Sequence, residues 1–149
     1  MTGTREDWFP TSIWYFDVPD LAGVHHDRWI AELYRLREED DEGVTDRSTR
    51  LGWHSDVDLD QNPLFAPLIE RILEAAGEIT AFEKWDLERG SISMINAWGI
   101  INPTHGYNAL HNHPASYLSG VYYLRIPEDS GDIVFRDPRE ARMMEASPY

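Results

Sequence analysis

The sequence predicts an α+β fold in which two helices come before an antiparallel sheet. In the first half of the chain, apolar residues recur at helical spacing over about 26–39 and again over 63–76. From residue 91 onward the pattern changes to short runs of β-branched and aromatic residues, separated by turns that contain proline and glycine. Helical segments followed by consecutive strands favour α+β over an alternating α/β architecture.

Length and charge limit the class of protein. The chain has 149 residues, of which 42% are hydrophobic and 12% aromatic, so one domain with a packed core is predicted over 1–149. We expect helical support over about 20–88 and strands over about 91–149. Acidic residues outnumber basic ones by 27 to 13, for a net charge of −14. This balance argues against nucleic acid and anionic membranes as partners.

Two absences from the sequence narrow the class further. The chain contains no cysteine, which excludes disulfides, thiolate catalysis and zinc sites built on cysteine. Its polar N-terminus has no segment typical of a signal peptide, and no apolar run approaches the roughly 18 residues that span a bilayer. The predicted location is therefore the cytoplasm. Aromatic residues near the N-terminus could serve an interface, so a homo-oligomer stays open.

The elements of the first half begin with an aromatic run. This run predicts a strand from about Thr11 to Val18, which Pro19 is expected to end. The first helix is expected from His26 to Glu39, because its apolar residues lie on one face and an acidic run follows it.

The second helix has a clearer start than end. Asn62 is predicted to cap it, with Pro63 at the first helical position. Gly77 is a plausible stop, although the helix could resume through Lys84. The polar stretch 45–60 between the helices is expected to form a loop with at most one short strand.

The second half is expected to consist of strands and turns. The predicted strands are 91–101, 118–126 and 132–136. The segment 102–106 reads as a turn, and 127–131 as a hairpin loop.

Two histidines one residue apart, His111 and His113, are the candidate metal ligands. In an extended segment their rings point to the same side, because side chains alternate along a strand. Two imidazoles that converge in this way form half of a metal site. The alternative interpretation is two polar side chains on one face of a sheet. Four further histidines are interpreted as surface, capping or packing residues: His25, His26, His54 and His105.

A series of short motifs carries a family resemblance. The motifs are Trp98, Asn102-Pro103, Gly106-Tyr107-Asn108, His111-Asn-His113-Pro114, Leu118-Ser-Gly-Val-Tyr-Tyr-Leu124, Ser130-Gly131 and Asp137-Pro-Arg139. Phe9-Pro-Thr and the Gly-Trp-His-Ser segment at 52–55 belong to the same pattern. Together they resemble a family of 2-oxoglutarate- and Fe(II)-dependent oxygenases, most of whose members are uncharacterised bacterial and phage proteins. The resemblance covers nearly the whole chain.

The resemblance implies a fold and a reaction. The fold would be a double-stranded β-helix, a cupin-like jelly-roll of two facing sheets, with the N-terminal helices packed on one sheet. Fe(II) would be held by a strand-borne His-x-acid pair and a distal histidine, with open positions for 2-oxoglutarate and O2. Oxidative decarboxylation of 2-oxoglutarate would yield succinate and CO2 and hydroxylate a small molecule or a peptide side chain.

The chain departs from the wider superfamily at two points. His113 stands where that superfamily has an acid, and Asp137, an alternative acid, fits a turn better. No histidine follows His113, and Arg136, Arg139 and Arg142 come too early for the arginine that would bind the 2-oxoglutarate carboxylate. We therefore expect an incomplete version of the domain, with C-terminal strands missing; loss of the second half of the site is the alternative.

The resemblance assigns roles to a small set of residues. His111 and His113 are the expected metal ligands, and Asn108, Tyr107 and Tyr123 the expected co-substrate contacts; no catalytic residue is assigned. Two other functions stay open. One is a non-catalytic jelly-roll module with an incomplete metal site, and the other is an all-histidine iron dioxygenase that does not use 2-oxoglutarate.

Overall fold

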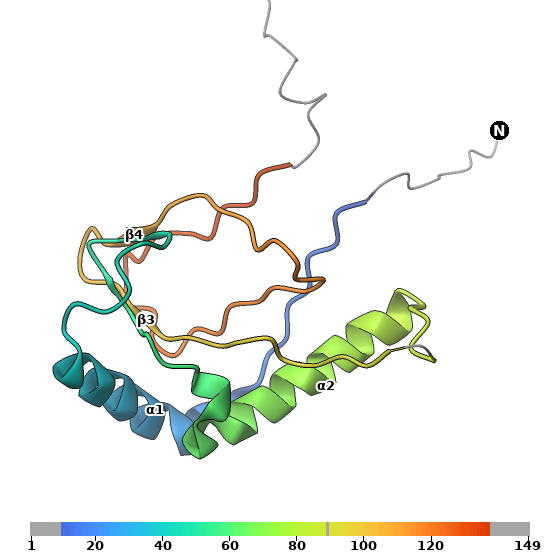
Figure 1. Ribbon diagram of the computed structural model, residues 1–149, viewed down its shortest axis with the longest axis horizontal. Helices are drawn as coiled ribbons and strands as arrows, with labels where there is room; N and C mark the ends of the chain where they lie inside the picture. Colours follow the sequence, from blue (N-terminus) through green and yellow to red (C-terminus); the bar gives the residue numbers. More distant parts are fainter. Residues whose placement is uncertain (1–9, 89, 138–149) are drawn as a thin grey trace, which may run out of the picture. The chain divides into compact units, whose positions relative to one another are not determined.

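The computed structural model describes residues 10–88 and 90–137. The chain divides into two compact units, one formed by Phe16–Leu124 and the other, within the described part, by 10–15 and 125–137. The first unit contains every helix and strand in the described ranges (Figure 1). The candidate site also lies in this unit.

The first helix, α1, spans Pro19–Glu39 and is longer than the sequence predicted. Pro19 occupies the start of the helix, where its fixed φ is compatible with the first turn and its missing N–H costs nothing. The prediction that Pro19 ends a strand was therefore wrong, and no strand is present within 11–18. The helix buries Leu21, Trp29 and Leu33, which lie on one face.

The second helix, α2, spans Ala66–Phe82 and follows two single-turn 3₁₀ helices, η1 (Leu59–Gln61) and η2 (Pro63–Phe65). Asn62 caps this region, because its side-chain oxygen accepts a hydrogen bond of 3.0 Å from the Leu64 backbone N–H. The predicted cap at Asn62 therefore forms on η2, with Pro63 directly after it, whereas α2 itself begins at Ala66 after Phe65. Gly77 does not end the helix, which continues to Phe82.

The core is centred on Trp29, which is fully buried. Its ring stacks on Phe65 with a centroid separation of 5.9 Å, and its indole N–H donates to the Leu64 carbonyl at 2.8 Å. A buried indole needs such a partner, because an unsatisfied donor is costly. The core cluster is completed by Leu21, Leu33 and Leu59.

Four short strands form two antiparallel pairs. They are β1 (Thr49–Arg50), β2 (Trp53–His54), β3 (Ile100–Ile101) and β4 (Tyr107–Asn108). Strand β1 pairs with β4, and β2 pairs with β3. Backbone hydrogen bonds extend the pairing at both ends: Ala109 N–H donates to Ser48 O at 2.8 Å, and Ser55 N–H donates to Gly99 O at 2.9 Å.

The two pairs are separated by loops of unequal length. Two residues, 51 and 52, separate β1 from β2, whereas five, 102–106, separate β3 from β4. The longer loop forms the predicted turn, with the Gly106 N–H donating to the Pro103 carbonyl at 2.8 Å. Gly52 is needed opposite this turn, because a Cβ there would lie 2.1 Å from the Asn102 side-chain oxygen.

The strands expected at 118–126 and 132–136 are not present as hydrogen-bonded ladders, and only Ile100–Ile101 of 91–101 is in a strand. Burial nevertheless alternates at the centre of the first segment, where Val121 and Tyr123 are exposed and Tyr122 and Leu124 are partly buried. This is the period of an extended chain, but a strand also needs a hydrogen-bonded neighbour. The jelly-roll therefore remains a prediction.

Candidate metal centre

The histidine pair lies directly after β4. The last backbone hydrogen bond to the β1 side is made by the Ala109 N–H, which donates to the Ser48 carbonyl. Residues 111–113 are in no strand, which corrects the expectation that the pair is strand-borne. The expected convergence of the rings occurs all the same. His111 is exposed and His113 is partly buried, so the pair is accessible from solvent on the side of His111.

The two imidazoles meet through their Nε2 atoms. These nitrogens lie 3.0 Å apart, and the ring planes are inclined by 54°. Two nitrogens that each bind one cation at about 2.1 Å, at right angles to each other, would also lie about 3.0 Å apart. The spacing of the pair therefore fits two adjacent positions in the shell of a single ion.

A backbone carbonyl sets the protonation pattern of His111. Its Nδ1 lies 2.7 Å from the Ala109 carbonyl oxygen, which can only accept, so Nδ1 carries the hydrogen. In the neutral ring Nε2 is then the acceptor, and His113 donates its own Nε2–H to it. A carbonyl bound to the far nitrogen is the usual way in which proteins orient a metal-binding histidine.

His113 is held by an aromatic ring. Trp98 stacks on it with a centroid separation of 5.6 Å and an interplanar angle of 10°. Trp98 also stacks on His54, with a centroid separation of 5.5 Å and an interplanar angle of 15°. Burial, and next the nearby His111, lower the pKa of His113 below its ordinary value of 6.5. The ring is therefore favoured in the neutral form that a metal ion requires.

His54 is a structural residue, as the sequence indicated. It is buried, and its Nδ1–H donates to the Ser55 carbonyl at 2.8 Å. The interpretation of His25 and His26 as solvent-facing or capping residues was wrong. His25 stacks on Trp29 at 4.9 Å, and His26 Nε2 shares a hydrogen bond of 2.7 Å with the Tyr122 hydroxyl. A sequence signal was available, since both residues precede Trp29 by three or four positions on one helix face.

The three expected co-substrate residues have different surroundings. The Asn108 amide has protein partners on both of its ends: it donates to the hydroxyls of Ser48 and Thr49, each at 3.3 Å, and accepts from Asn102 at 3.0 Å. It thereby joins β1, β4 and the turn between β3 and β4. Tyr107 and Tyr123 are about half exposed, at 56% and 49%.

Among the residues that the structure describes, a third metal ligand is not found beside the pair. Within 10–88 and 90–137, no three side chains of the metal-binding types His, Cys, Asp or Glu form a group that could hold an ion. The pair thus supplies two positions of a shell and fits a metal ion to that extent. Arg139 and Arg142, which were considered for the co-substrate carboxylate, lie outside the described residues.

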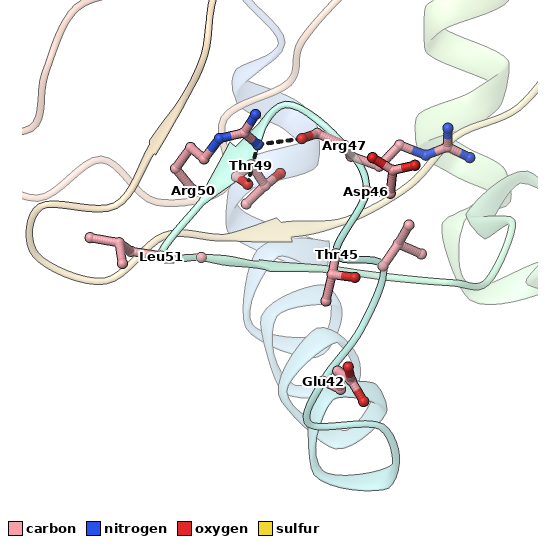
Figure 2. Close-up of a pocket in the computed structure, with 9 residues that line it drawn as sticks. Glu42, Thr45, Asp46, Arg47, Thr49, Arg50 and Leu51 are labelled. Carbon is pink, nitrogen blue, oxygen red and sulfur yellow. Dashed lines mark hydrogen bonds between the residues drawn. The ribbon is translucent and has the colours of Figure 1, made fainter.

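A separate pocket of about 310 Å³ lies on the segment that connects α1 to β2 (Figure 2). Acidic and basic side chains share its lining: Glu42, Asp46, Arg47 and Arg50. Figure 2 shows the Arg50 guanidinium turned back onto the chain, where it donates to the carbonyl oxygens of Arg47 and Thr49. Since that guanidinium binds backbone carbonyls, it serves to hold the loop.

Comparison with known proteins identifies the class of the C-terminal part. Residues 96–149 match the family described as "Putative 2OG-Fe(II) oxygenase". This match contains both members of the histidine pair, and it confirms the family resemblance inferred from the sequence. No curated protein and no solved structure matches the chain. None of the helices in the described ranges is both long and apolar enough to cross a membrane.

Proposed function

We propose that this protein is an Fe(II)-dependent oxygenase that uses 2-oxoglutarate and hydroxylates a small molecule or a peptide side chain. The observation that carries the proposal is the convergence of His111 and His113, whose Nε2 atoms are 3.0 Å apart. The family match over 96–149 supports it independently, because that family is one of 2-oxoglutarate and iron enzymes. The choice of a small molecule or a peptide side chain as target follows from the class alone.

His111 and His113 would hold the iron through their Nε2 atoms. When bound, the metal and 2-oxoglutarate would supply an oxidative decarboxylation with O2 as the oxidant, in which one oxygen atom ends in succinate, CO2 is released and the other oxygen atom hydroxylates a C–H bond of the substrate. The Ala109 carbonyl keeps the hydrogen of His111 on Nδ1 and its Nε2 lone pair directed at the site. His113 must lose its Nε2–H to bind, so its remaining hydrogen must be carried on Nδ1.

In this proposal the co-substrate is contacted by exposed phenols. Tyr107 and Tyr123 are available as hydrogen-bond donors, because about half of each side chain is open to solvent. Asn108 is better explained by its three protein partners, and its contribution is to hold Tyr107 on β4. We therefore expect Tyr107 and Tyr123 to affect 2-oxoglutarate binding, and Asn108 to affect folding first.

Two alternatives are each favoured by one observation. An all-histidine iron dioxygenase is favoured by the imidazole at position 113, since it leaves the iron shell without a carboxylate charge. A binding module without catalysis is favoured by the two-ligand site, because a third ligand is missing from the neighbourhood that the structure describes. Both alternatives keep the histidine pair as the metal site. The first oxidises a substrate without consuming 2-oxoglutarate, and the second catalyses no reaction.

The test follows 2-oxoglutarate rather than the unidentified substrate. Succinate formation is measured by NMR with purified protein, Fe(II), ascorbate and O2, for the wild type, His111→Ala and His105→Asn. His105 is the matched control because it is exposed and has φ of 68°, a conformation that asparagine tolerates. We expect turnover in the wild type and the control and none in His111→Ala.

Other results separate the alternatives. Iron binding by the wild type without succinate would reject the 2-oxoglutarate reaction and leave the other two functions. Stoichiometric iron retained by His111→Ala would reject the histidine pair as the site.

A further inference from the structure

We propose that Trp98, backed by His54, is a positioning residue that fixes the ring plane of His113, so that its Nε2 faces the same point as that of His111. The inference rests on the proposed function only in taking His113 as a metal ligand. It adds a support for the site that comes from His54 of β2 and from Trp98, two residues before β3. The three rings form a continuous stack in the order His54, Trp98, His113.

His54, at one end of the stack, is held in a fixed orientation. His54 is buried, lies on β2 and pairs across the sheet with Ile100 of β3. Its Nδ1–H is bound to the Ser55 carbonyl at 2.8 Å, so the plane of the imidazole is fixed by a hydrogen bond as well as by packing. The Trp98 ring lies nearly parallel to this fixed plane, at 15°.

The backbone on both sides of Trp98 is also anchored. Ala97 donates its N–H to the Asp60 carboxylate at 3.0 Å and accepts from the Leu59 N–H at 2.7 Å. Gly99 donates to the Ser55 hydroxyl at 3.0 Å and accepts from the Ser55 N–H at 2.9 Å. Four hydrogen bonds thus hold the two neighbours of Trp98, so the backbone that carries the indole is fixed in position.

Gly99 and Trp98 face opposite sides of the chain. A Cβ at this position would lie 2.4 Å from a methyl group of Leu33, so residue 99 faces the core beneath α1. Since consecutive residues of an extended segment face opposite sides, Trp98 faces away from α1. The glycine therefore lets α1 pack closely on one side while the indole is presented to the histidine pair on the other.

The stack orients His113 without using either ring nitrogen. A hydrogen bond would occupy Nδ1 or Nε2, whereas contact through the ring face leaves both edges free. His111 is oriented instead by a hydrogen bond through its far nitrogen. Residues 111–113 are in no strand, so the backbone alone does not fix the His113 side chain. Because the stack holds the ring in one rotamer before metal binds, metal binding does not have to pay the entropy cost of ordering it.

The test compares Trp98→Phe, which keeps a ring, with Trp98→Leu, which removes it. Trp85→Leu is the control, since Trp85 contacts Tyr117 rather than the histidine pair. Binding of Co(II) is measured by calorimetry and by its visible spectrum, and folding by near-UV circular dichroism. We expect Trp98→Leu to weaken Co(II) affinity about tenfold, within the range found for outer contacts of metal ligands. Trp98→Phe and the control should stay within about threefold of the wild type.

A second readout needs no metal. Because His113 lies over the indole face, its carbon-bound ring protons should resonate upfield of those of His105 in the metal-free protein, and the shift should disappear in Trp98→Leu. A wild type without this upfield shift overturns the proposal even if Trp98→Leu fails to fold. Wild-type affinity in Trp98→Leu, or equal losses in the two Trp98 variants, also overturns it. A wild type that shows the upfield shift but binds no Co(II) rejects the proposed function and leaves the orientation of His113 by Trp98 established.

Discussion

At the scale of single residues, the two histidines of the candidate centre are distinguished by what surrounds them. His111 is exposed and binds a carbonyl, whereas His113 is partly buried against an indole. Burial disfavours the charged imidazole, and a second imidazole beside it adds like-charge repulsion. Of the two rings, His113 is therefore the one whose surroundings disfavour protonation.

This difference predicts the titration of His113 in the metal-free protein. Its pKa should lie below 6.5, and His111→Ala should raise it only in part, because burial is the larger cause and remains. A depressed folded-state pKa means that the contribution of His113 to stability is present above the unfolded pKa and is lost as the pH falls through the folded one. Histidine NMR titrations check the values, with His105→Asn as control. A His113 pKa at or above 6.5 contradicts the prediction.

At the scale of elements, α1 is connected to the segment that follows the histidine pair. The link is the hydrogen bond of 2.7 Å between His26 and Tyr122, supported by edge-on contacts of the Tyr122 ring with His26 and Trp29. Tyr122 thereby fixes one side of residues 118–124 onto the core, while Tyr123 points outward. The expected alternation of side chains is therefore present in this segment, with Tyr122 facing α1 and Tyr123 facing solvent.

The link predicts a loss of stability at alkaline pH. Burial, and next the charge of Asp20, raise the pKa of Tyr122 above 10.0, so its neutral form is the one that folding favours. A raised folded-state pKa gives stability that is present below the unfolded pKa and is lost as the pH rises through the folded one. Tyr122→Phe should cost about 1 kcal/mol at pH 7, through the lost hydrogen bond. The variant should also lose less of its free energy of unfolding at alkaline pH than the wild type does, because it lacks the ionisable hydroxyl.

Urea unfolding at neutral and alkaline pH measures both effects. Tyr123→Phe is the matched control, because it removes the same hydroxyl from the exposed neighbour. Equal effects of the two substitutions would contradict the role given to Tyr122.

The different surroundings of Gly99 and Gly77 predict opposite effects of the same substitution at the two positions. Gly99→Ala should destabilise the protein by about 1–3 kcal/mol, because the added methyl meets Leu33 in the packed core. Gly77→Ala should stabilise it by about 0.5–1 kcal/mol, because this residue lies within α2 and a Cβ there meets no atom within 4 Å. Denaturant unfolding gives both values. A neutral Gly99→Ala would show that Leu33 can move aside.

At the scale of the whole molecule, the net charge of −14 creates a field that concentrates cations near the surface. This field acts on any divalent ion and does not select the histidine pair. Selection comes from the two converging Nε2 atoms, which are held by the stack of His54 and Trp98 and by the Ala109 carbonyl. Metal binding should therefore be linked to folding of the unit that contains these residues.

This linkage predicts stabilisation by metal. Co(II) at about 100 times its Kd should stabilise the native state by about 2.7 kcal/mol, because the paired geometry is absent from the unfolded chain. Thermal unfolding with and without Co(II) measures the shift, with His111→Ala and His105→Asn compared in parallel. The shift should vanish in His111→Ala and persist in His105→Asn. A shift that is equal in both variants would assign the stabilisation to the acidic surface instead.

Features with a local cause could be predicted from the sequence. The cap at Asn62 and the turn at 102–106 are set by neighbouring residues, and the convergence of His111 and His113 needs only an extended link of one residue. The start of α1 was missed because Pro19 is compatible with both a strand end and a helix start. The strands at 118–126 and 132–136 were over-predicted, since alternation describes an extended chain but cannot supply its partner.

By itself, the sequence determined the two helical segments, the histidine pair and the family of residues 96–149. Only the tertiary structure decided that His54 and Trp98 stack beneath His113, and that His26 binds Tyr122 across 96 positions of the chain. The physical reason is range. Capping and side-chain alternation act over a few residues, whereas ring stacking and strand register depend on which distant segments meet, and one sequence pattern is compatible with many such pairings.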